Sequence, residues 1–178
     1  LGAHMGGEAA GCTVVPMSTG NTKRQIQIMK DFGTDILCAT PSYALLIADT
    51  AIEMGYDPAK DFPISGVILG AEPASEHMRE EIRQKFGVKY CDVYGLSEIM
   101  GPGVAMECSE SHGLHVAEDQ FLVEIVDPET LEPVPDGQLG ELVITTLTRE
   151  CSPLIRYRTR DLTRIIDEPC ACGRTHRK

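Results

Sequence analysis

Short apolar runs alternate with amphipathic runs over the first hundred residues, and this alternation restricts the fold more than any other feature. The apolar runs predict strands at residues 11–17, 34–40, 64–70 and 88–95, and the segments between them predict helices within 18–33, 42–55 and 75–87. Nearly continuous apolar strands that alternate with helices favour a parallel sheet covered by helices. The sequence therefore predicts an α/β fold.

The predicted helices carry local signals at their ends. Ile26, Met29 and Phe32 are spaced to share one face of the first helix. Ser75 is a typical N-cap, and Gly87 is a typical helix stop. The stretch MSTGNTK contains phosphate-loop residue types, but its spacing does not fit the phosphate-loop pattern. We interpret STGNT as a turn and helix cap.

The pattern changes to β-structure after about residue 115. The runs QFLVEIVD, ELVITTL and LIRYRTRDLTRII predict strands, and the turn-rich PETLEPVPDGQLG lies between the first two. We expect a small antiparallel β subdomain at 115–178 and an α/β subdomain at 11–114. The opening LGAHM is typical of a cloning remnant, so residues 1–10 are expected to be that remnant and the start of a fragment.

Charge and composition exclude several classes of partner. The net charge is −11, from 27 acidic and 16 basic residues, which disfavours nonspecific binding to nucleic acid or to an anionic membrane. No apolar run approaches the ~20 residues that would span a bilayer. Seven cysteines without an export signal indicate a reducing compartment, so a cytoplasmic location is expected.

Two loops that follow predicted strands, LGAEP and YGLSE, combine glycine with polar side chains. Ligands of open parallel sheets bind beyond the carboxyl ends of the strands. Gly70 and Gly95 would let the backbone approach a flat ligand, and Tyr94 could stack on it. Ser97 could bind a phosphate and Glu98 a divalent cation. Alternatively, both loops are helix-entry turns in which the glutamate favours a helix N-terminus.

Several motifs in a fixed order resemble the AMP-forming acid ligases, most closely the phenylacetate-CoA ligase branch. These motifs are CTVVPMSTGNTKRQ, TPSYALLIA, GAEP, VYGLSE, GELVITTL, PLIRYRTRDLT and PCACGRTH. The resemblance covers nearly the whole chain from about Gly11. It implies that a carboxylic acid reacts with ATP to give an acyl-adenylate, and that coenzyme A then takes the acyl group.

The resemblance also implies a role for individual residues. Tyr94 and Gly95 match the adenine-binding segment, and Asp161 matches the carboxylate that binds both ribose hydroxyls. Ser97 and Glu98 are the implied catalytic residues, one near the α-phosphate and the other as the Mg²⁺ ligand. The loop that lines the nucleotide and acyl pocket is Gly70, Ala71, Glu72 and Pro73.

One residue departs from the wider superfamily, which usually has glycine before the ribose-binding aspartate. This chain has Arg160 there, so the local turn is open to question. The resemblance further implies an upstream phosphate loop and a downstream lysine domain, so we expect this chain to be an inactive internal fragment. It also suggests a homodimer.

The identity of the acid is left open by the sequence. Tyr43 could form one wall of an aromatic acyl pocket together with Gly70 and Ala71, and phenylacetate is the first suggestion of the resemblance. Tyr43 could equally be a half-buried core tyrosine. Other aryl acids, or the deazaflavin cofactor of an adenylating relative, are alternatives.

Cysteine and histidine residues in two distant segments suggest a zinc site. Cys108, Cys170, Cys172 and His115 would supply four ligands suited to tetrahedral Zn²⁺. Either His112 or His176 could replace His115, and ordinary cysteines in exposed loops are the alternative. Since a site with four protein ligands is closed, we expect a structural role.

A function of a different class also fits part of the sequence. A zinc-stabilised nucleotide-binding or interaction module without catalysis would explain the cysteine cluster. It would not explain why Tyr94, Glu98 and Asp161 all match the ligase pattern.

Overall fold

The computed structural model describes residues 2–17, 20–110 and 113–178. The chain divides into two compact units, unit 1 up to Val93 and unit 2 from Tyr94 to Lys178. The subdomain boundaries expected at residues 10 and 114 stay a prediction. Among the residues described, no helix combines the length and apolar character needed to cross a membrane.

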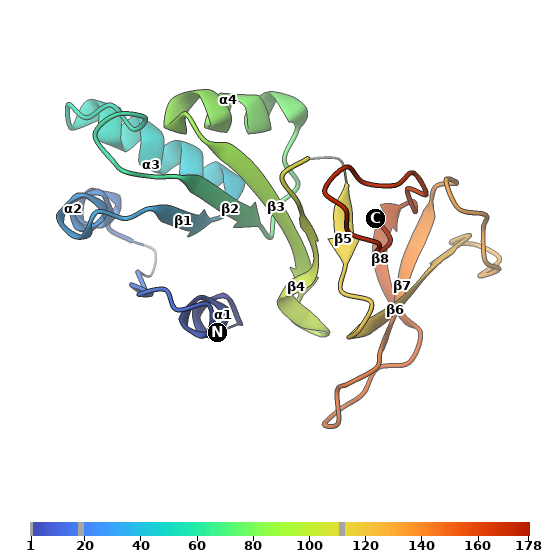
Figure 1. The fold of residues 1–178 in the computed structure, drawn as a ribbon. Coiled ribbons are helices and arrows are strands. Elements are labelled where there is room, and N and C mark those ends of the chain that lie inside the picture. Colours follow the sequence, from blue (N-terminus) through green and yellow to red (C-terminus); the bar gives the residue numbers. More distant parts are fainter. Residues whose placement is uncertain (1, 18–19, 111–112) are drawn as a thin grey trace. The chain divides into compact units, whose positions relative to one another are not determined.

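Unit 1 contains the predicted α/β alternation. Its strands are β1 (Ile36–Ala39), β2 (Gly66–Gly70) and the first part of β3 (Lys89–Leu96), and its helices are α1 (Gly2–Ala9), α2 (Thr22–Phe32), α3 (Pro41–Glu53) and α4 (Glu76–Phe86). The strands β1, β2 and β3 pair in parallel, and Figure 1 shows α3 and α4 on one side of them. The predicted parallel arrangement is confirmed.

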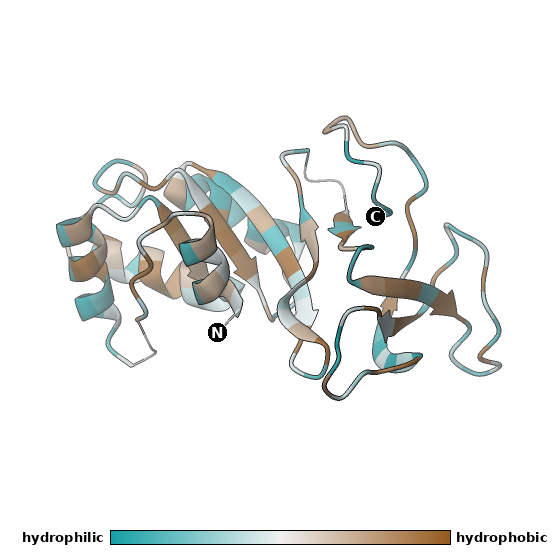
Figure 2. Cartoon of the chain, turned by 60° about the horizontal axis from the view of Figure 1, so that its bottom comes forward, coloured by the Kyte–Doolittle hydropathy of each residue, from teal (hydrophilic) through white to brown (hydrophobic). Residues whose placement is uncertain are grey.

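The core of unit 1 forms where the helices meet the strands. Ile26 of α2, Ile47 of α3 and Ile82 of α4 are almost completely buried together with Val67 and Leu69 of β2. The helices are amphipathic, and Figure 2 shows hydrophobic and hydrophilic residues mixed along them. The hydrophobic faces therefore pack on the sheet.

Ile26 and Met29 lie on the buried face of α2 as predicted, but Phe32, the last residue of this helix, is 69% exposed, so its expected place on that face is wrong. The predicted capping residues act as expected. The Ser75 side chain accepts a hydrogen bond from the Met78 backbone N–H at 3.2 Å, and Asn21 does the same for Arg24 at 2.9 Å. Gly87 ends α4 in the left-handed conformation, at φ 68°. These side chains and glycines satisfy backbone groups that a helix leaves unpaired at its ends.

The segment 11–17 is not a strand, which corrects the sequence prediction. Its described residues have no regular secondary structure. They follow a helix, α1, within the residues expected to be a cloning remnant and the start of a fragment. A strand exists only where its backbone groups pair with a neighbour, and Pro16 has no N–H to offer. Apolar residues alone did not decide the conformation.

Unit 2 is built from antiparallel strands. The strands β4 (Met100–Glu107) and β5 (Leu114–Val116) pair with each other, and β6 (Phe121–Val126), β7 (Gly140–Thr146) and β8 (Tyr157–Thr163) form a three-stranded sheet. The second sheet confirms the predicted antiparallel β-structure. Its core includes Ile144, Phe121 and Val123.

The strands β4 and β5 were not predicted from the sequence. These two strands pair antiparallel within unit 2, so the strands that follow β3 do not continue the parallel pattern of unit 1. Gly101, Pro102 and Gly103 lie within β4 and weaken its strand signal. The antiparallel pairing of β4 with β5 stabilises both strands, although the local sequence gives only a weak strand signal.

The cap of α4 generates a prediction for stability. Replacing Ser75→Ala removes the acceptor for the Met78 N–H and should destabilise the protein by about 1 kcal/mol. Exchange protection of the Met78 amide and the thermal midpoint should both fall. Ser75→Thr keeps a hydroxyl at this position and is the matched control. Equal values for Ser75→Ala and the parent protein would show that the cap contributes nothing.

Candidate functional site

Tyr94 and Asp161 come together within unit 2, although 67 positions separate them in the sequence. Tyr94 lies at the end of β3 and Asp161 lies in β8. The Tyr94 hydroxyl donates a hydrogen bond to the Asp161 carboxylate at 2.5 Å. Burial, together with this carboxylate, raises the pKa of Tyr94, so its hydroxyl stays protonated at neutral pH. An aromatic ring and an exposed carboxylate are thus held side by side.

Ser97 and Glu98 occupy the turn that links β3 to β4. Both residues are exposed to solvent. The turn is followed by a strand, so the alternative that YGLSE is a helix-entry turn is wrong. Ser97 and Glu98 can reach a ligand outside the sheet without any loss of core packing.

Arg149, 51 positions after Glu98, contacts this turn and was not predicted from the sequence as a site residue. Its guanidinium donates to the backbone oxygen of Glu98 and, at 3.3 Å, to that of Ile99. The contact leaves the Glu98 carboxylate available for other partners. A lone arginine after a strand, in TTLTRE, gives no local signal of such a contact.

Glycine is required at positions 70 and 95 by neighbouring strands. A Cβ atom at Gly95 would lie 2.4 Å from the Met100 carbonyl oxygen, and one at Gly70 would lie 2.3 Å from that of Val93. Cβ atoms do not approach backbone oxygens this closely. Strand packing therefore accounts for both glycines, whether or not a ligand also approaches them.

Glu72 binds the N-terminus of α3. Its carboxylate accepts hydrogen bonds from the Ser42 backbone N–H at 3.1 Å and from the Ser42 hydroxyl at 2.9 Å. These bonds lower the pKa of Glu72. Thr40, the N-cap residue of α3, makes no capping bond with its own side chain. The GAEP loop, in which Ala71 has φ 67°, thus supplies the missing cap.

A cavity of about 430 Å³ lies in unit 1 beside the start of α3. Tyr43 is in its wall and also packs against the core of unit 1. The Tyr43 hydroxyl donates to Gln25 at 2.9 Å. The other lining residues are Met17, Gln25, Cys38, Ala39, Thr40 and Ser42. Tyr43 is therefore both a packing residue and part of a cavity large enough for a small organic acid.

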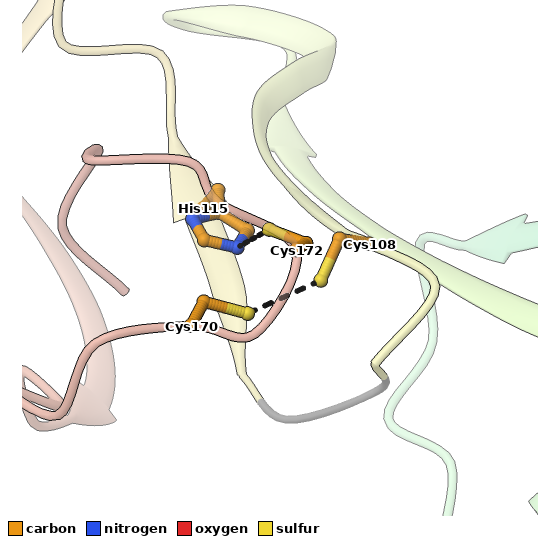
Figure 3. Close-up of side chains that lie close together, drawn as sticks. All are labelled: Cys108, His115, Cys170 and Cys172. Carbon is orange, nitrogen blue, oxygen red and sulfur yellow. Dashed lines mark hydrogen bonds between the residues drawn. The ribbon is translucent and has the colours of Figure 1, made fainter.

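Cys108, His115, Cys170 and Cys172 form one cluster in unit 2, as predicted (Figure 3). Their candidate ligand atoms all lie within 4.8 Å of one another. The Cys108 and Cys170 sulfurs are 3.5 Å apart, and the Cys172 sulfur is 3.4 Å from His115 Nε2. Figure 3 shows the four side chains converging from β5, the end of β4 and the C-terminal segment.

Backbone groups surround this cluster and favour particular forms of two of its donors. His115 Nδ1 lies 3.2 Å from the His176 carbonyl oxygen, which suits a tautomer with Nε2 free for a metal. The Arg174 backbone N–H lies 3.4 Å from the Cys172 sulfur and lowers the pKa of this thiol to about 6. His176 thus contributes its carbonyl group, and His112 lies outside the described residues.

The donor set fits zinc by distance as well as by chemistry. Tetrahedral Zn–S bonds of about 2.3 Å place two sulfurs about 3.8 Å apart. The observed spacing of 3.5 Å between the Cys108 and Cys170 sulfurs is close to this value. All seven cysteines are free thiols, so no disulfide competes for the four ligands.

Comparison with known proteins identifies the family. The AMP-binding enzyme family matches residues 3–148. The chain belongs to this family. It is 54% identical over 167 residues to a phenylacetate-coenzyme A ligase of Pseudomonas putida, with 93% of the chain and 38% of that protein covered. It is 49% identical over 177 residues to the enzyme of the same name from Thermus thermophilus, with 99% and 40% covered.

Solved structures agree with this assignment. An open conformation of 2-hydroxyisobutyryl-CoA ligase, in complex with 2-HIB-AMP and CoA, has a TM-score of 0.94 and 27% identity over 99% of this chain and 40% of its own. A benzoate CoA ligase from Burkholderia xenovorans, with a TM-score of 0.60 and 17% identity over 84% of this chain and 30% of its own, shares the fold. The family and fold predicted from the motifs are confirmed, and the chain spans about two fifths of its curated relatives.

The contact between Glu72 and Ser42 makes unit 1 sensitive to acid. Because the pKa of Glu72 is lowered in the folded protein, its contribution is present above the ordinary glutamate pKa of 4.5 and is lost as the pH falls through the lowered value. The Ser42 amide resonance should therefore shift in a nuclear magnetic resonance titration below pH 4.5.

Glu72→Gln should abolish this titration and weaken protection of the Ser42 amide already at neutral pH. The control is Glu53→Gln, because Glu53 lies at the other end of the same helix. An unchanged Ser42 titration in Glu72→Gln would contradict the assignment of the cap.

Proposed function

We propose that this chain carries the nucleotide-binding residues of an AMP-forming acid-CoA ligase. The observation that supports this most directly is the contact between Tyr94 and Asp161 within unit 2. The ligase pattern assigns adenine to the tyrosine and the ribose hydroxyls to the aspartate. These two groups are neighbours in an adenosine nucleotide, so their protein partners must also be neighbours.

Each exposed polar residue then has a role in forming the acyl-adenylate. Asp161 accepts hydrogen bonds from the ribose hydroxyls, which suits a carboxylate with two acceptor oxygens. Ser97 donates to the α-phosphate, and the Glu98 carboxylate would hold Mg²⁺. When bound, this ion would neutralise charge that builds up on the phosphate. The substrate acid is ionised at neutral pH, so it needs no general base.

The acid that we propose is phenylacetate, with coenzyme A as the acceptor. Relatives at 49% and 54% identity are phenylacetate-coenzyme A ligases. The cavity beside Tyr43 presents an aromatic wall and a volume of about 430 Å³. The resemblance places the acyl group near Gly70 and Ala71 as well. No observation favours the deazaflavin cofactor as the substrate.

We also propose that Cys108, His115, Cys170 and Cys172 bind a structural zinc ion. Their four ligands would close the coordination shell, which leaves no position for a substrate. The ion would tie the C-terminal segment to β4 and β5, which belong to the same unit. Its contribution is to the stability of unit 2 and not to the chemical step.

A binding module without catalysis is not favoured by these observations. Membership of the AMP-binding enzyme family accounts for the motifs in both units. A module that binds only a partner would not need the contact between Tyr94 and Asp161 or the exposed Glu98. A cytoplasmic location, expected from the cysteines, and a homodimer, suggested by the resemblance, stay predictions.

Nucleotide binding can be tested by calorimetry on the full-length protein with AMP and a non-hydrolysable phenylacetyl-adenylate analogue. We expect tighter binding of the analogue than of AMP. Tyr94→Ala should weaken both about tenfold or more because base stacking on an aromatic ring is lost, and Asp161→Ala should do so because two hydrogen bonds to a charged group are lost.

Asp167→Ala is the matched control, because Asp167 is an exposed aspartate a few residues after β8. Its affinities should equal those of the parent protein. Equal affinities for all four proteins would refute the proposed nucleotide site. Preference for another acyl group would refute phenylacetate alone.

Zinc binding can be tested by elemental analysis of the purified full-length protein. We expect one zinc ion per chain, lost in Cys170→Ser together with a lower thermal midpoint, because three ligands hold zinc far more weakly than four. Cys151→Ser changes an exposed cysteine outside the cluster and should keep the metal. A full zinc content in Cys170→Ser would contradict the proposed ligand set.

A further inference from the structure

A β-bulge in β8 presents Asp161. Glu141 of β7 pairs with Leu162, and Val143 pairs with Arg158. The segment from Arg158 to Leu162 in β8 is therefore two residues longer than the segment of β7 opposite it. The extra length contains Thr159, Arg160 and Asp161. Bulges of this kind redirect a side chain and are frequent beside active sites. The orientation of Asp161 therefore depends on what holds the bulge.

The backbone of the bulge is in an unfavourable conformation. Arg160 has φ 70°, in the left-handed region that favours glycine. This is the position at which the wider superfamily usually has glycine, and the structure shows why glycine would suit it. A side chain such as arginine stays in this region only when its surroundings hold it there.

Glu141 supplies that restraint. Its side chain is only 2% exposed, and one carboxylate oxygen accepts the Arg160 backbone N–H at 3.3 Å. Its other oxygen lies 3.9 Å from the Arg160 guanidinium. Arg158 fixes the carboxylate itself, with Nε 3.0 Å and 3.2 Å from its two oxygens. A buried carboxylate is thus aimed at the strained residue.

Thr159 links this restraint to Asp161. Its hydroxyl donates to the Leu142 carbonyl oxygen at 2.9 Å and accepts the Asp161 backbone N–H at 3.1 Å. Thr159 is therefore hydrogen-bonded to β7, and Thr159 and Asp161 are hydrogen-bonded to each other across Arg160. The backbone has little freedom left at Asp161 as long as Arg160 stays left-handed.

We propose that Glu141 is a positioning residue that aims Asp161 at the ribose by holding Arg160 in the left-handed conformation. This inference rests on the proposed contact between Asp161 and the ribose. It explains how the chain keeps a ribose-binding turn without the usual glycine. Glu141 itself touches no ligand.

The ratio of the dissociation constants for 2′-deoxy-AMP and AMP reports on this contact, measured by calorimetry on the full-length protein. In the parent protein we expect about a tenfold preference for AMP, because one hydrogen bond to a carboxylate is lost in the deoxy compound. Glu141→Ala should bring the ratio close to one. The double variant Glu141→Ala with Arg160→Gly should restore the preference, because glycine adopts the left-handed conformation without help.

Two further variants keep the test decisive. Arg160→Val leaves Glu141 in place but puts a β-branched residue at a positive φ, so it should also lose the preference even if Glu141→Ala does not fold. Glu124→Gln is the control, because Glu124 pairs with Arg156 in the same sheet and Arg156 also has a positive φ, 51°. This control should keep the parent ratio.

The results separate this inference from the function on which it rests. A parent ratio close to one would overturn both, since Asp161 would then not bind the 2′-hydroxyl. A parent preference that disappears in Asp161→Ala but survives in Glu141→Ala or Arg160→Val would overturn the positioning role alone. A double variant as impaired as Glu141→Ala would show that Glu141 does not act through Arg160.

Discussion

Close backbone packing at the ends of the strands is the constraint on which the candidate site depends. At Gly70 and at Gly95 a neighbouring carbonyl oxygen occupies the space where a Cβ atom would lie. The strands can approach this closely only because both positions lack a side chain. The loops that follow then leave the sheet at fixed places. Tyr94, Ser97 and Glu98 take their positions in unit 2 from the turn next to Gly95.

Charged side chains stabilise these loops by satisfying backbone groups. Glu72 accepts the Ser42 N–H in unit 1, while in unit 2 Arg149 donates to the Glu98 carbonyl oxygen and Glu141 accepts the Arg160 N–H. Each contact joins segments that are far apart in the sequence. A buried or constrained backbone group without a partner would cost free energy, so these charges stabilise conformations that the loops would not adopt alone. None of these three contacts uses the side-chain carboxylate of Glu98 or Asp161, and both residues are exposed to solvent.

In the cysteine cluster of unit 2, too, backbone groups contact the side chains that form the candidate site. The three thiols and His115 converge, whereas Arg174 and His176 contribute backbone groups around them. The Arg174 N–H favours the thiolate form of Cys172, and the His176 carbonyl group favours one tautomer of His115. Both effects favour the donor forms that the proposed zinc ion would require. The proposed zinc therefore has a site whose outer contacts are already in place.

The sequence by itself determined the helices α2 to α4, the parallel strands β1 to β3, the antiparallel sheet of unit 2, the family and the three cysteines of the cluster. It could do so because periodicity, helix caps and ordered motifs are local signals. Tertiary structure alone decided that residues 11–17 are not a strand and that β4 and β5 are strands, because strands require partners. It also decided the roles of Arg149 and Glu141, whose contacts lie 51 and 19 positions away. No local pattern encodes such contacts, since they exist only once the chain has folded back on itself.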